Sequence, residues 1–422
     1  MVKPPSSFQS IQLDFAPQEV ARWLRHLPGL VFFDTAQDRG SEALSIVAAE
    51  PAFILNGTST DSAWERLRTA VASRQVHGSP DCGLPLGFAA GWIEYDGSFC
   101  FGFYDELLVF RHSDERWYSL GSLHEKIEQT PDSAGKHLGK NPGSPVFQPE
   151  LSRAQFMAMV DRAKDYIAAG DIYQVNLSHR FSTAWEGDPF LFYNALRHYS
   201  PAPHASFLSL GDRCILSSSP ELFLKISGRE IATRPIKGTR PRKADRHADE
   251  MSAYDLITSP KEVAELVMIT DLERNDLGQV CEFGSVTVRD MLKLERYEQV
   301  FHLVSTVEGR LREDVDAVSA LRACFPGGSI TGAPKKRAME IIAELEPSAR
   351  GLYTGAIGYF GFNVESQFNI AIRTVVLEHG EAHFHVGAGI VADSRADKEW
   401  QETLDKAAGI LLAAERAHSP QD

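Results

Sequence analysis

Basic residues gather around one lysine in the middle of the chain. Five of the ten residues from Arg234 to Lys243 are lysine or arginine, and Lys237 stands among them between Ile236 and Gly238. A lysine amine that is partly desolvated among other cations loses its proton more readily, and it can then act as a nucleophile or a base. A solvated basic loop would explain the same composition. The segment alone leaves both interpretations open.

Four glutamates are spaced so that they could bind a cation. Glu262 and Glu265 lie three residues apart in one predicted helix, and Glu399 and Glu402 do so in the last predicted helix. Side chains with this spacing share a helical face, and Mg²⁺ prefers carboxylate oxygens with water completing its coordination. Helix capping explains Glu262 equally well, and a solvated face explains the other pair. No pattern within one segment decides between these interpretations.

A glycine-rich loop from Phe325 to Lys335 resembles a phosphate-binding loop at first sight. Ala333 and Pro334, however, replace the lysine and the serine or threonine that such a loop requires, so a nucleotide site is not predicted. A glycine loop at a helix N-terminus suits a carboxylate or a hydroxyl instead. The segment Gly387-Ala-Gly389 could offer backbone N–H groups to a further anion, although a glycine kink in a strand explains it as well.

The elements that must position these residues follow from the spacing of apolar side chains. A capping-box pattern, Ser152 with Gln155, begins one helix, which Gly170 ends. A helix begins at Ser259-Pro260, with an apolar side made of Val263, Leu266, Val267 and Thr270. Further helices are predicted from Pro334 and from about Ala396 to Glu415.

A strand predicted from Tyr173 to Phe181 alternates between apolar and polar residues. Its odd positions, including Tyr173 and Val175, are expected to face the core, and Gln174 and Asn176 could line a cavity. Many other predicted strands are linked as hairpins. The fold class is therefore α+β (mixed α/β) with a large antiparallel share.

Composition and charge exclude several classes of protein. The net charge of −14 argues against nonspecific nucleic-acid binding, and an anionic substrate would need local positive charge. The five cysteines form no C-x-x-C pair, so neither a zinc site nor a disulfide framework is predicted. No apolar segment is long enough for a signal sequence or a membrane span, and we expect a soluble cytoplasmic protein that binds neither membrane nor nucleic acid.

Several long motifs, in one order, resemble the chorismate-utilising enzyme family from about Leu151 to Leu412. The resemblance implies large, mainly antiparallel β-sheets in a layered sandwich with flanking helices. It also implies a chorismate-binding catalytic core over residues 146–422, after an anthranilate-synthase-component-I-like region over residues 1–145, with the boundary in the polar connection 121–149. The motifs are Gly170-Asp-Ile-Tyr-Gln-Val-Asn-Leu177, Ser218-Ser-Pro-Glu-Leu-Phe223, Pro235-Ile-Lys-Gly-Thr-Arg240, Asp271-Leu-Glu-Arg-Asn-Asp-Leu-Gly278, His302-Leu-Val-Ser-Thr306, Phe325 to Lys335, Ile372-Arg-Thr374, Gly387-Ala-Gly-Ile-Val391 and Glu402-Thr-Leu-Asp-Lys406.

Two positions separate the reactions within the family. Isochorismate and salicylate synthases have a water-activating lysine where Gln174 stands, so the glutamine implies an ammonia-using member. Anthranilate synthases typically have alanine where Lys237 stands, and aminodeoxychorismate synthases have lysine. The resemblance therefore implies formation of 4-amino-4-deoxychorismate, a step toward 4-aminobenzoate and folate. Anthranilate synthase component I is the alternative within the family, and a non-catalytic subunit that binds chorismate or an amino acid is the alternative outside it.

The resemblance also assigns roles to residues. Lys237 would attack C2 of chorismate, Glu221 would protonate the departing C4 hydroxyl with His302 beside it, and Gln174 would stand at the nucleophile's position. Glu265 and Glu402, with Glu399 and Glu262 nearby, would hold Mg²⁺. The residues implied to bind the substrate are Arg373, Tyr353, Ser329, Lys406, Thr239, Gly387 and Gly389.

Two further expectations concern partners. The sequence shows no glutaminase, so ammonia is expected from a separate glutamine amidotransferase subunit. The segment Val31-Phe-Phe-Asp-Thr35 stands where tryptophan-inhibited anthranilate synthases have Leu-Leu-Glu-Ser, and we expect no inhibition by tryptophan, although a structural tryptophan could bind there.

Overall fold

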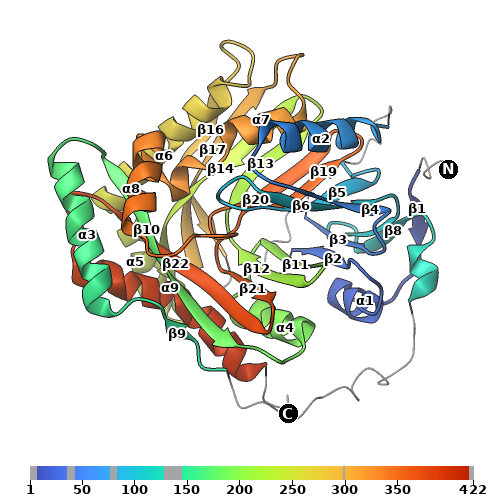
Figure 1. The fold of residues 1–422 in the computed structure, drawn as a ribbon, viewed down its shortest axis with the longest axis horizontal. Coiled ribbons are helices and arrows are strands. Elements are labelled where there is room, and N and C mark those ends of the chain that lie inside the picture. Colours follow the sequence, from blue (N-terminus) through green and yellow to red (C-terminus); the bar gives the residue numbers. More distant parts are fainter. Residues whose placement is uncertain (1–6, 36–42, 77–82, 128–144, 298–299, 418–422) are drawn as a thin grey trace.

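Two large antiparallel sheets form the centre of the molecule in the computed structural model (Figure 1). The structure describes residues 7–35, 43–76, 83–127, 145–297 and 300–417. The first sheet, sheet A, has the strand order β1-β8-β7-β3-β2-β11-β12-β21-β22-β10-β18, with β9 beside β10. Its strands are β1 (Gln9–Ile11), β2 (Val31–Asp34), β3 (Leu44–Ala48), β7 (Leu107–Arg111), β8 (Arg116–Leu120), β9 (Gln148–Pro149), β10 (Gln174–Ala184), β11 (His204–Leu210), β12 (Arg213–Ser219), β18 (Gly332–Ala333), β21 (Thr374–Glu378) and β22 (Glu381–Ile390).

The second sheet, sheet B, has the order β15-β17-β14-β13-β20-β19-β5-β6-β4, with β16 beside β17. Its longest described strand, β17, is buried along most of its length and lies between β14 and β15. The strands are β4 (Phe53–Gly57), β5 (Phe88–Ile93), β6 (Phe99–Tyr104), β13 (Leu222–Ser227), β14 (Glu230–Arg234), β15 (Ile236–Pro241), β16 (Thr287–Arg296), β17 (Val300–Arg310), β19 (Ala356–Gly361) and β20 (Glu365–Ile370).

Helices cover the outer faces of both sheets, so the layers run helix, sheet, sheet, helix (Figure 1). Side chains of both sheets, among them Ile46, Trp92, Ile215 and Tyr359, fill the space between them. Full burial of such a side chain stabilises the fold by about 1.5–3 kcal/mol. The helices are α1 (Pro17–Leu24), α2 (Asp61–Ala72), α3 (Arg153–Ala168), α4 (Pro189–Tyr199), α5 (Arg246–Ile257), α6 (Pro260–Gly278), α7 (Ala317–Cys324), α8 (Lys335–Leu345) and α9 (Ala396–Arg416), with 3-10 turns η1 (Leu123–Lys126) and η3 (Gly328–Ile330).

The predicted α+β sandwich is confirmed, and so are the helix starts predicted at Ser152 and Ser259, while α8 begins at Lys335, one residue after the predicted Pro334. The Ser152 hydroxyl oxygen accepts a hydrogen bond from the backbone N–H of Gln155. The Gln155 side-chain oxygen in turn accepts one from the backbone N–H of Ser152. The Ser259 hydroxyl accepts from the N–H of Glu262 at the start of α6. These bonds satisfy N–H groups that a helix N-terminus leaves free.

Two local predictions were wrong. Tyr173 does not face the core: it is 74% exposed, because β10 begins one residue later. Val267 on α6 is 42% exposed, since the buried side of that helix runs through Leu266, Ile269 and Thr270. Of the two interpretations left open for the segment around Lys237, the solvated loop does not hold, because the segment is strand β15 and pairs with β17.

Strands from residues 1–145 and from residues 146–422 form separate blocks that meet at one strand pair in each sheet. In sheet A, β2 pairs with β11, and in sheet B, β5 pairs with β19. A boundary near residue 145 stays a prediction, since residues 128–144 of the predicted connection lie outside the described residues, as does Cys82. The four described cysteines are free. Within the described residues, no helix is long and apolar enough to cross a membrane.

Candidate active site

Lys237 is turned into the molecule by a bulge in β15. The pairing with β17 shifts between Lys237 and Thr239, and Gly238 between them has a φ of +76°, which glycine adopts without strain. The Lys237 side chain is only 20% exposed, and its Nζ lies 3.7 Å from Glu265 Oε2. An ideal Cβ on Gly238 would lie 2.6 Å from the side chain of Leu256, so a larger residue would not fit there.

Gln174 and Gly389 lie beside this amine. A Cβ atom placed on Gly389 would lie 3.0 Å from Gln174 Nε2 and 3.5 Å from Lys237 Nζ. The Gln174 amide and the Lys237 amine therefore both border the space that the missing side chain leaves open. Gln174 is buried on β10, and its Oε1 has no hydrogen-bond partner within the described residues. An unpaired buried amide oxygen is costly unless a ligand bonds to it.

Glu221 immediately precedes β13 and is buried. Burial raises the pKa of its carboxyl, while the Ser329 hydroxyl and the charges of Lys237 and Lys406 act in the opposite direction. The balance favours the protonated form relative to a free glutamate. A buried carboxyl that holds its proton beside a lysine amine can act as a general acid.

His302 and Thr239 face each other across the β15–β17 pair, with His302 Nδ1 3.0 Å from Thr239 Oγ1. Burial, with the nearby charge of Arg373, lowers the pKa of His302 to about 4, so the imidazole is neutral near pH 7. Burial also lowers the pKa of Arg373. The Arg373 guanidinium has no carboxylate partner among the residues described, so it can donate paired hydrogen bonds to an anion.

The four predicted acidic residues come together from two helices. Lys261 on α6 lies 3.9 Å from Glu265 Oε1 and 3.6 Å from Glu399 Oε1 of α9, so one cation links the two helices. The charges of Glu402 and Glu262 also raise the pKa of Lys261. Glu262 accepts a hydrogen bond from Arg240, 3.4 Å long, and Glu402 pairs with Lys406 at 2.8 Å.

This acidic cluster fits a hard cation in its donor chemistry. Glu265 Oε1 and Glu399 Oε2, one on each helix, are buried oxygens without a hydrogen-bond partner in the described part of the chain. All the donors are carboxylate oxygens, which Mg²⁺ prefers. Within that same part, however, no three ligating side chains converge closely enough to form a metal site.

The remaining predicted residues lie around Gly387. Lys406 Nζ donates to the carbonyl oxygen of Gly387 over 2.8 Å. An ideal Cβ on Gly387 would lie 2.7 Å from the Tyr353 hydroxyl, and the Tyr353 ring stacks on His385 with centroids 5.5 Å apart. Ser329, on η3, reaches the same region through its contact with Glu221. Motifs far apart in the sequence therefore meet in one site.

Residues 33–412 match a known family, the chorismate binding enzymes. The chain belongs to this family. Among its relatives, aminodeoxychorismate synthase component 1 of Bacillus subtilis is 41% identical over 74% of this chain and 70% of its own length. Anthranilate synthase component 1 of Thermus thermophilus is 46% identical over 68% of this chain and 62% of its own length. The chain thus spans about two thirds of the length of these relatives.

Two solved structures have the same fold as this chain. Anthranilate synthase component I from Streptococcus pneumoniae aligns with a TM-score of 0.77 and 32% identity, covering 87% of this chain and 92% of that one. MenF, the menaquinone-specific isochorismate synthase from Escherichia coli, aligns with a TM-score of 0.73 and 19% identity, over 98% and 95% of the two chains. The predicted fold of this family is confirmed.

Several residues of the site were not among those predicted. Arg350 and Glu346 form a buried ion pair at 2.8 Å, and Arg350 also donates to the carbonyl oxygens of Asn176 and Ile330. Lys261 was visible in the sequence as a lysine four residues before Glu265. Glu346 and Arg350 have the same four-residue spacing, but the bonds from Arg350 to backbone partners 20 and 174 residues away gave no signal in the sequence.

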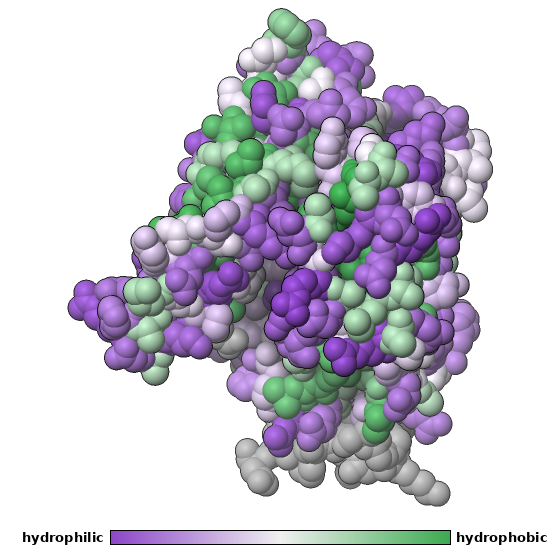
Figure 2. All heavy atoms as spheres, turned by 90° about the vertical axis from the view of Figure 1, so that its left-hand side faces the viewer, coloured by the Kyte–Doolittle hydropathy of each residue, from purple (hydrophilic) through white to green (hydrophobic). Residues whose placement is uncertain are grey.

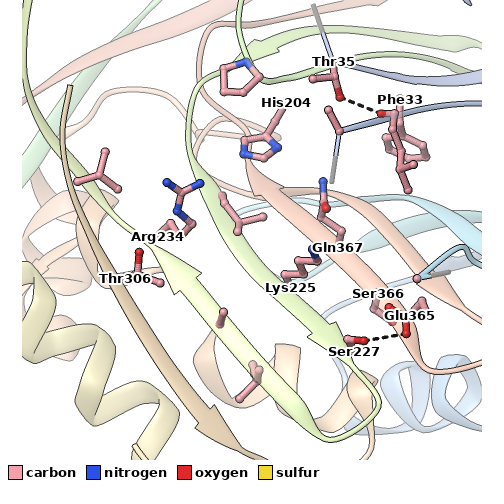
Figure 3. Close-up of a pocket in the computed structure, with 18 of the residues that line it drawn as sticks. Phe33, Thr35, His204, Lys225, Ser227, Arg234, Thr306, Glu365, Ser366 and Gln367 are labelled. Atoms are coloured by element: carbon pink, nitrogen blue, oxygen red, sulfur yellow. Dashed lines mark hydrogen bonds between the residues drawn. The ribbon is translucent and has the colours of Figure 1, made fainter. Parts of the chain in front are cut away.

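A separate cavity of about 890 Å³ lies between the sheets (Figure 3). Phe33 and Thr35 of the segment that replaces Leu-Leu-Glu-Ser line it, together with His204, Lys225 and Arg234. Its described lining includes none of the predicted site residues. The lining does include Pro220 and Ile236, which precede Glu221 and Lys237 in the sequence. The cavity is therefore adjacent to the candidate site. Whether tryptophan binds there stays a prediction.

Proposed function

We propose that this chain converts chorismate and ammonia to 4-amino-4-deoxychorismate. The observation that carries the proposal is the position of Lys237. The β15 bulge holds its amine beside the open space at Gly389, next to the Gln174 amide. A lysine there can form a covalent intermediate, whereas an alanine could not. The similarity to an aminodeoxychorismate synthase component supports the same product.

The reaction would use two displacements. The neutral amine of Lys237 forms a bond to C2, the ring double bonds shift, and the C4–O bond breaks as Glu221 gives its proton to the leaving hydroxyl, which departs as water. Ammonia then forms a bond to C4, the double bonds return, and the C2–Nζ bond breaks. A proton of the new ammonium group returns to the Glu221 carboxylate. The raised pKa of Glu221 suits this acid and base cycle.

Charge complementarity would orient the substrate. Arg373 would donate two parallel N–H hydrogen bonds to the enolpyruvyl carboxylate. Neutral His302 and Thr239 would lie near the C4 hydroxyl. The substrate would also be bound by Tyr353, Ser329 and Lys406 and by the backbone of Gly387 and Gly389. These few groups supply positive charge and N–H donors in a chain whose net charge is −14.

Enzymes of this family are generally Mg²⁺-dependent. In this chain Glu265 and Glu402, with Glu399 and Glu262, would hold the ion. When bound, Mg²⁺ would neutralise the ring carboxylate and favour electron flow through the diene.

Ammonia would come from a separate glutamine amidotransferase subunit. Purified chain mixed with such a subunit is expected to form a complex and to turn over chorismate with glutamine in place of ammonium. A size-exclusion profile that shows no complex, together with no glutamine-dependent turnover, would contradict this partner.

The anthranilate synthase reaction is the second candidate. Anthranilate synthase components 1 of Thermus thermophilus and Synechocystis are 46% and 48% identical to this chain, as close as the aminodeoxychorismate synthase component. That reaction would release pyruvate and an aromatic product from the same substrate.

Product analysis by mass spectrometry distinguishes the candidates. The chain, incubated with chorismate, Mg²⁺ and an ammonium salt, is expected to form 4-amino-4-deoxychorismate. Lys237→Ala is expected to lower the rate by at least about 10²-fold, the usual range for losing a catalytic group of this kind. Anthranilate and pyruvate would establish the second candidate. Binding of chorismate without turnover would instead support a non-catalytic binding subunit.

A further inference from the structure

Arg350 uses every hydrogen-bond donor of its buried side chain. A guanidinium has five N–H groups. Two of them, on Nε and Nη2, donate to the two carboxylate oxygens of Glu346 over 2.9 and 2.8 Å. The other three donate to the carbonyl oxygens of Asn176 and Ile330, over 2.5 and 3.1 Å, and to the Thr354 hydroxyl, over 3.1 Å. The side chain is only 1% exposed, so water competes little with these bonds.

This arginine and its ion-pair partner hold two positions of β10, and each position lies opposite a glycine that is proposed to bind the substrate. Asn176 is the register partner of Gly389, and Ser178 is the partner of Gly387. Arg350 holds the first position through the Asn176 carbonyl oxygen. The carboxylate of the ion pair holds the second, because one of its oxygens accepts from the backbone N–H and the hydroxyl of Ser178 over 2.7 and 2.9 Å.

The bond to Thr354 leads to Tyr353, another residue that is proposed to bind chorismate. The Thr354 hydroxyl accepts from Arg350 and donates to the carbonyl oxygen of Tyr353 over 2.5 Å. Thr354 has a φ of +61°, which a β-branched residue adopts only when its surroundings hold it there. Its N–H donates to the carbonyl oxygen of Ala371 over 2.8 Å, two residues before Arg373. The bond from Arg350 therefore supports a strained residue between two parts of the substrate site.

The bond to Ile330 reaches the turn η3, which also carries Ser329 of the proposed substrate-binding set. Tyr95, from the loop after β5, covers the guanidinium, with its ring centroid 4.8 Å from Arg350 Cζ. None of the five donated bonds goes to β15, the strand that carries Lys237. The contacts of Arg350 thus reach groups that would bind the substrate and not the proposed nucleophile.

We propose that Arg350 is a positioning residue for chorismate binding: it joins β10, η3 and the turn of Tyr353 and Thr354, so that groups on all three segments contact the substrate together. This inference rests on the proposed function, in which those groups bind chorismate. Arginine suits the place because its rigid planar fork bonds to several segments at once, whereas a lysine ammonium is one compact charge with three donors. Loss of the fork weakens substrate binding and leaves the chemistry of the bound substrate largely intact.

Separate values of KM and kcat for chorismate, measured with Mg²⁺ and ammonium, test this role in Arg350→Lys. The lysine keeps the positive charge of the ion pair but cannot make all five bonds. KM is expected to rise about 10-fold or more, the effect of losing one hydrogen bond to a charged group, while kcat stays within about 3-fold. A merely structural residue would act differently, because partial unfolding lowers the concentration of active enzyme. A fall in apparent kcat with KM unchanged would therefore overturn the inference.

Thr354→Val tests the same role without changing a buried charge, and it serves if the lysine variant does not fold. It removes only the hydroxyl that links Arg350 to Tyr353. KM is expected to rise about 2- to 10-fold, the range for one neutral hydrogen bond. Thr354→Ser keeps the hydroxyl and is expected to bring KM back near the wild-type value. Equal KM values in wild type and Thr354→Val would contradict the role of Arg350.

Arg213→Lys is the matched control. Arg213 also pairs with two carboxylates, those of Glu94 and Glu378, and its Cζ lies 5.9 Å from the centroid of the Trp92 ring. It lies on β12 outside the candidate site, and its replacement is expected to leave KM unchanged. A KM that rises equally in both lysine variants would show that the effect is not particular to Arg350, and the inference would fail.

Equilibrium dialysis of chorismate against the chain, with Mg²⁺ and without ammonium, measures affinity in the absence of turnover. Arg350→Lys is expected to raise the Kd about as much as it raises KM. An unchanged Kd would refute the role of Arg350. Wild type that binds chorismate but forms no 4-amino-4-deoxychorismate when ammonium is added would refute the proposed function instead, so the two failures are distinguishable.

Discussion

Burial keeps the His302 imidazole neutral, and the stability of the folded protein therefore depends on pH. With a folded pKa of about 4 against an unfolded value near 6.5, the native state binds fewer protons than the unfolded state between these values. Stability contributed by neutral His302 is therefore present above pH 6.5 and is lost as the pH falls toward 4. At 1.36 kcal/mol for each pKa unit, the loss is about 3 kcal/mol.

His302→Gln is expected to flatten this part of the curve of unfolding free energy against pH. Urea unfolding at intervals from pH 4 to pH 7 measures it. His247→Gln, at an exposed position on α5, serves as the control. A slope that is unchanged by the His302 substitution would show that the imidazole is already charged in the folded protein.

The buried ion pair of Arg350 and Glu346 fixes the far side of the site. The side chains are 1% and 4% exposed. Glu346→Gln would leave the guanidinium charge buried without compensation, which typically costs about 3–5 kcal/mol. Glu344→Gln, two residues earlier and exposed, is expected to cost less than about 1 kcal/mol. Urea unfolding of both variants checks this, and equal effects would contradict it.

Sequence alone identified the candidate site residues better than the residues that support them. Lys237, Glu221 and Glu402 stand in motifs long enough to be matched to a family. The bonds from Arg350 to the carbonyl oxygens of Asn176 and Ile330 could not be predicted, because they depend on which distant segments meet. The bulge at Gly238 was missed for a related reason: only its partner strand β17 turns the segment into a strand.

At the scale of elements, α6 and α9 form the two sides of the proposed magnesium site. Without the ion, Lys261 is the cation between Glu265 and Glu399. Mg²⁺ that binds only the folded state should stabilise it by RT ln(1 + [Mg²⁺]/Kd), about 2.7 kcal/mol at 100 times Kd. Thermal unfolding with Mg²⁺ and with a chelator measures the effect without any assay of activity.

Glu399→Gln is expected to abolish most of that Mg²⁺-dependent shift, because it removes a ligand whose Oε2 is buried and unpaired among the described residues. Glu415→Gln, at an exposed position on the same helix, is expected to retain it. A shift that survives the Glu399 substitution would place the ion elsewhere. Helix α6 was predicted from its cap and α9 over about Ala396 to Glu415, but the approach of the two helices to each other was not predicted.

At the scale of the molecule, the pairing of an N-terminal strand with a C-terminal strand in each sheet predicts one cooperative unit. The face of the molecule that carries α3, α5, α6 and α8 is mostly hydrophilic, with hydrophobic side chains gathered over its upper part (Figure 2). Removal of residues 1–145 would take β2 from beside β11 and β5 from beside β19, exposing apolar surface in both sheets.

Urea unfolding followed by tryptophan fluorescence and by circular dichroism is therefore expected to show coincident transitions. The tryptophans suit this comparison, since Trp92 lies in β5 and Trp400 in α9. Two separated transitions would instead support independent domains over residues 1–145 and 146–422.

The pairing of β5 with β19 also affects how the chain is made. More than 250 residues separate Ile93 from its partner Ala356. At a synthesis rate of about 5–20 residues per second, β5 would leave the ribosome roughly 15–50 seconds before β19 exists. During that interval an apolar strand, buried in the finished protein, has no native neighbour on one edge. Newly made chains should therefore depend on chaperones far more than refolding of the complete protein does.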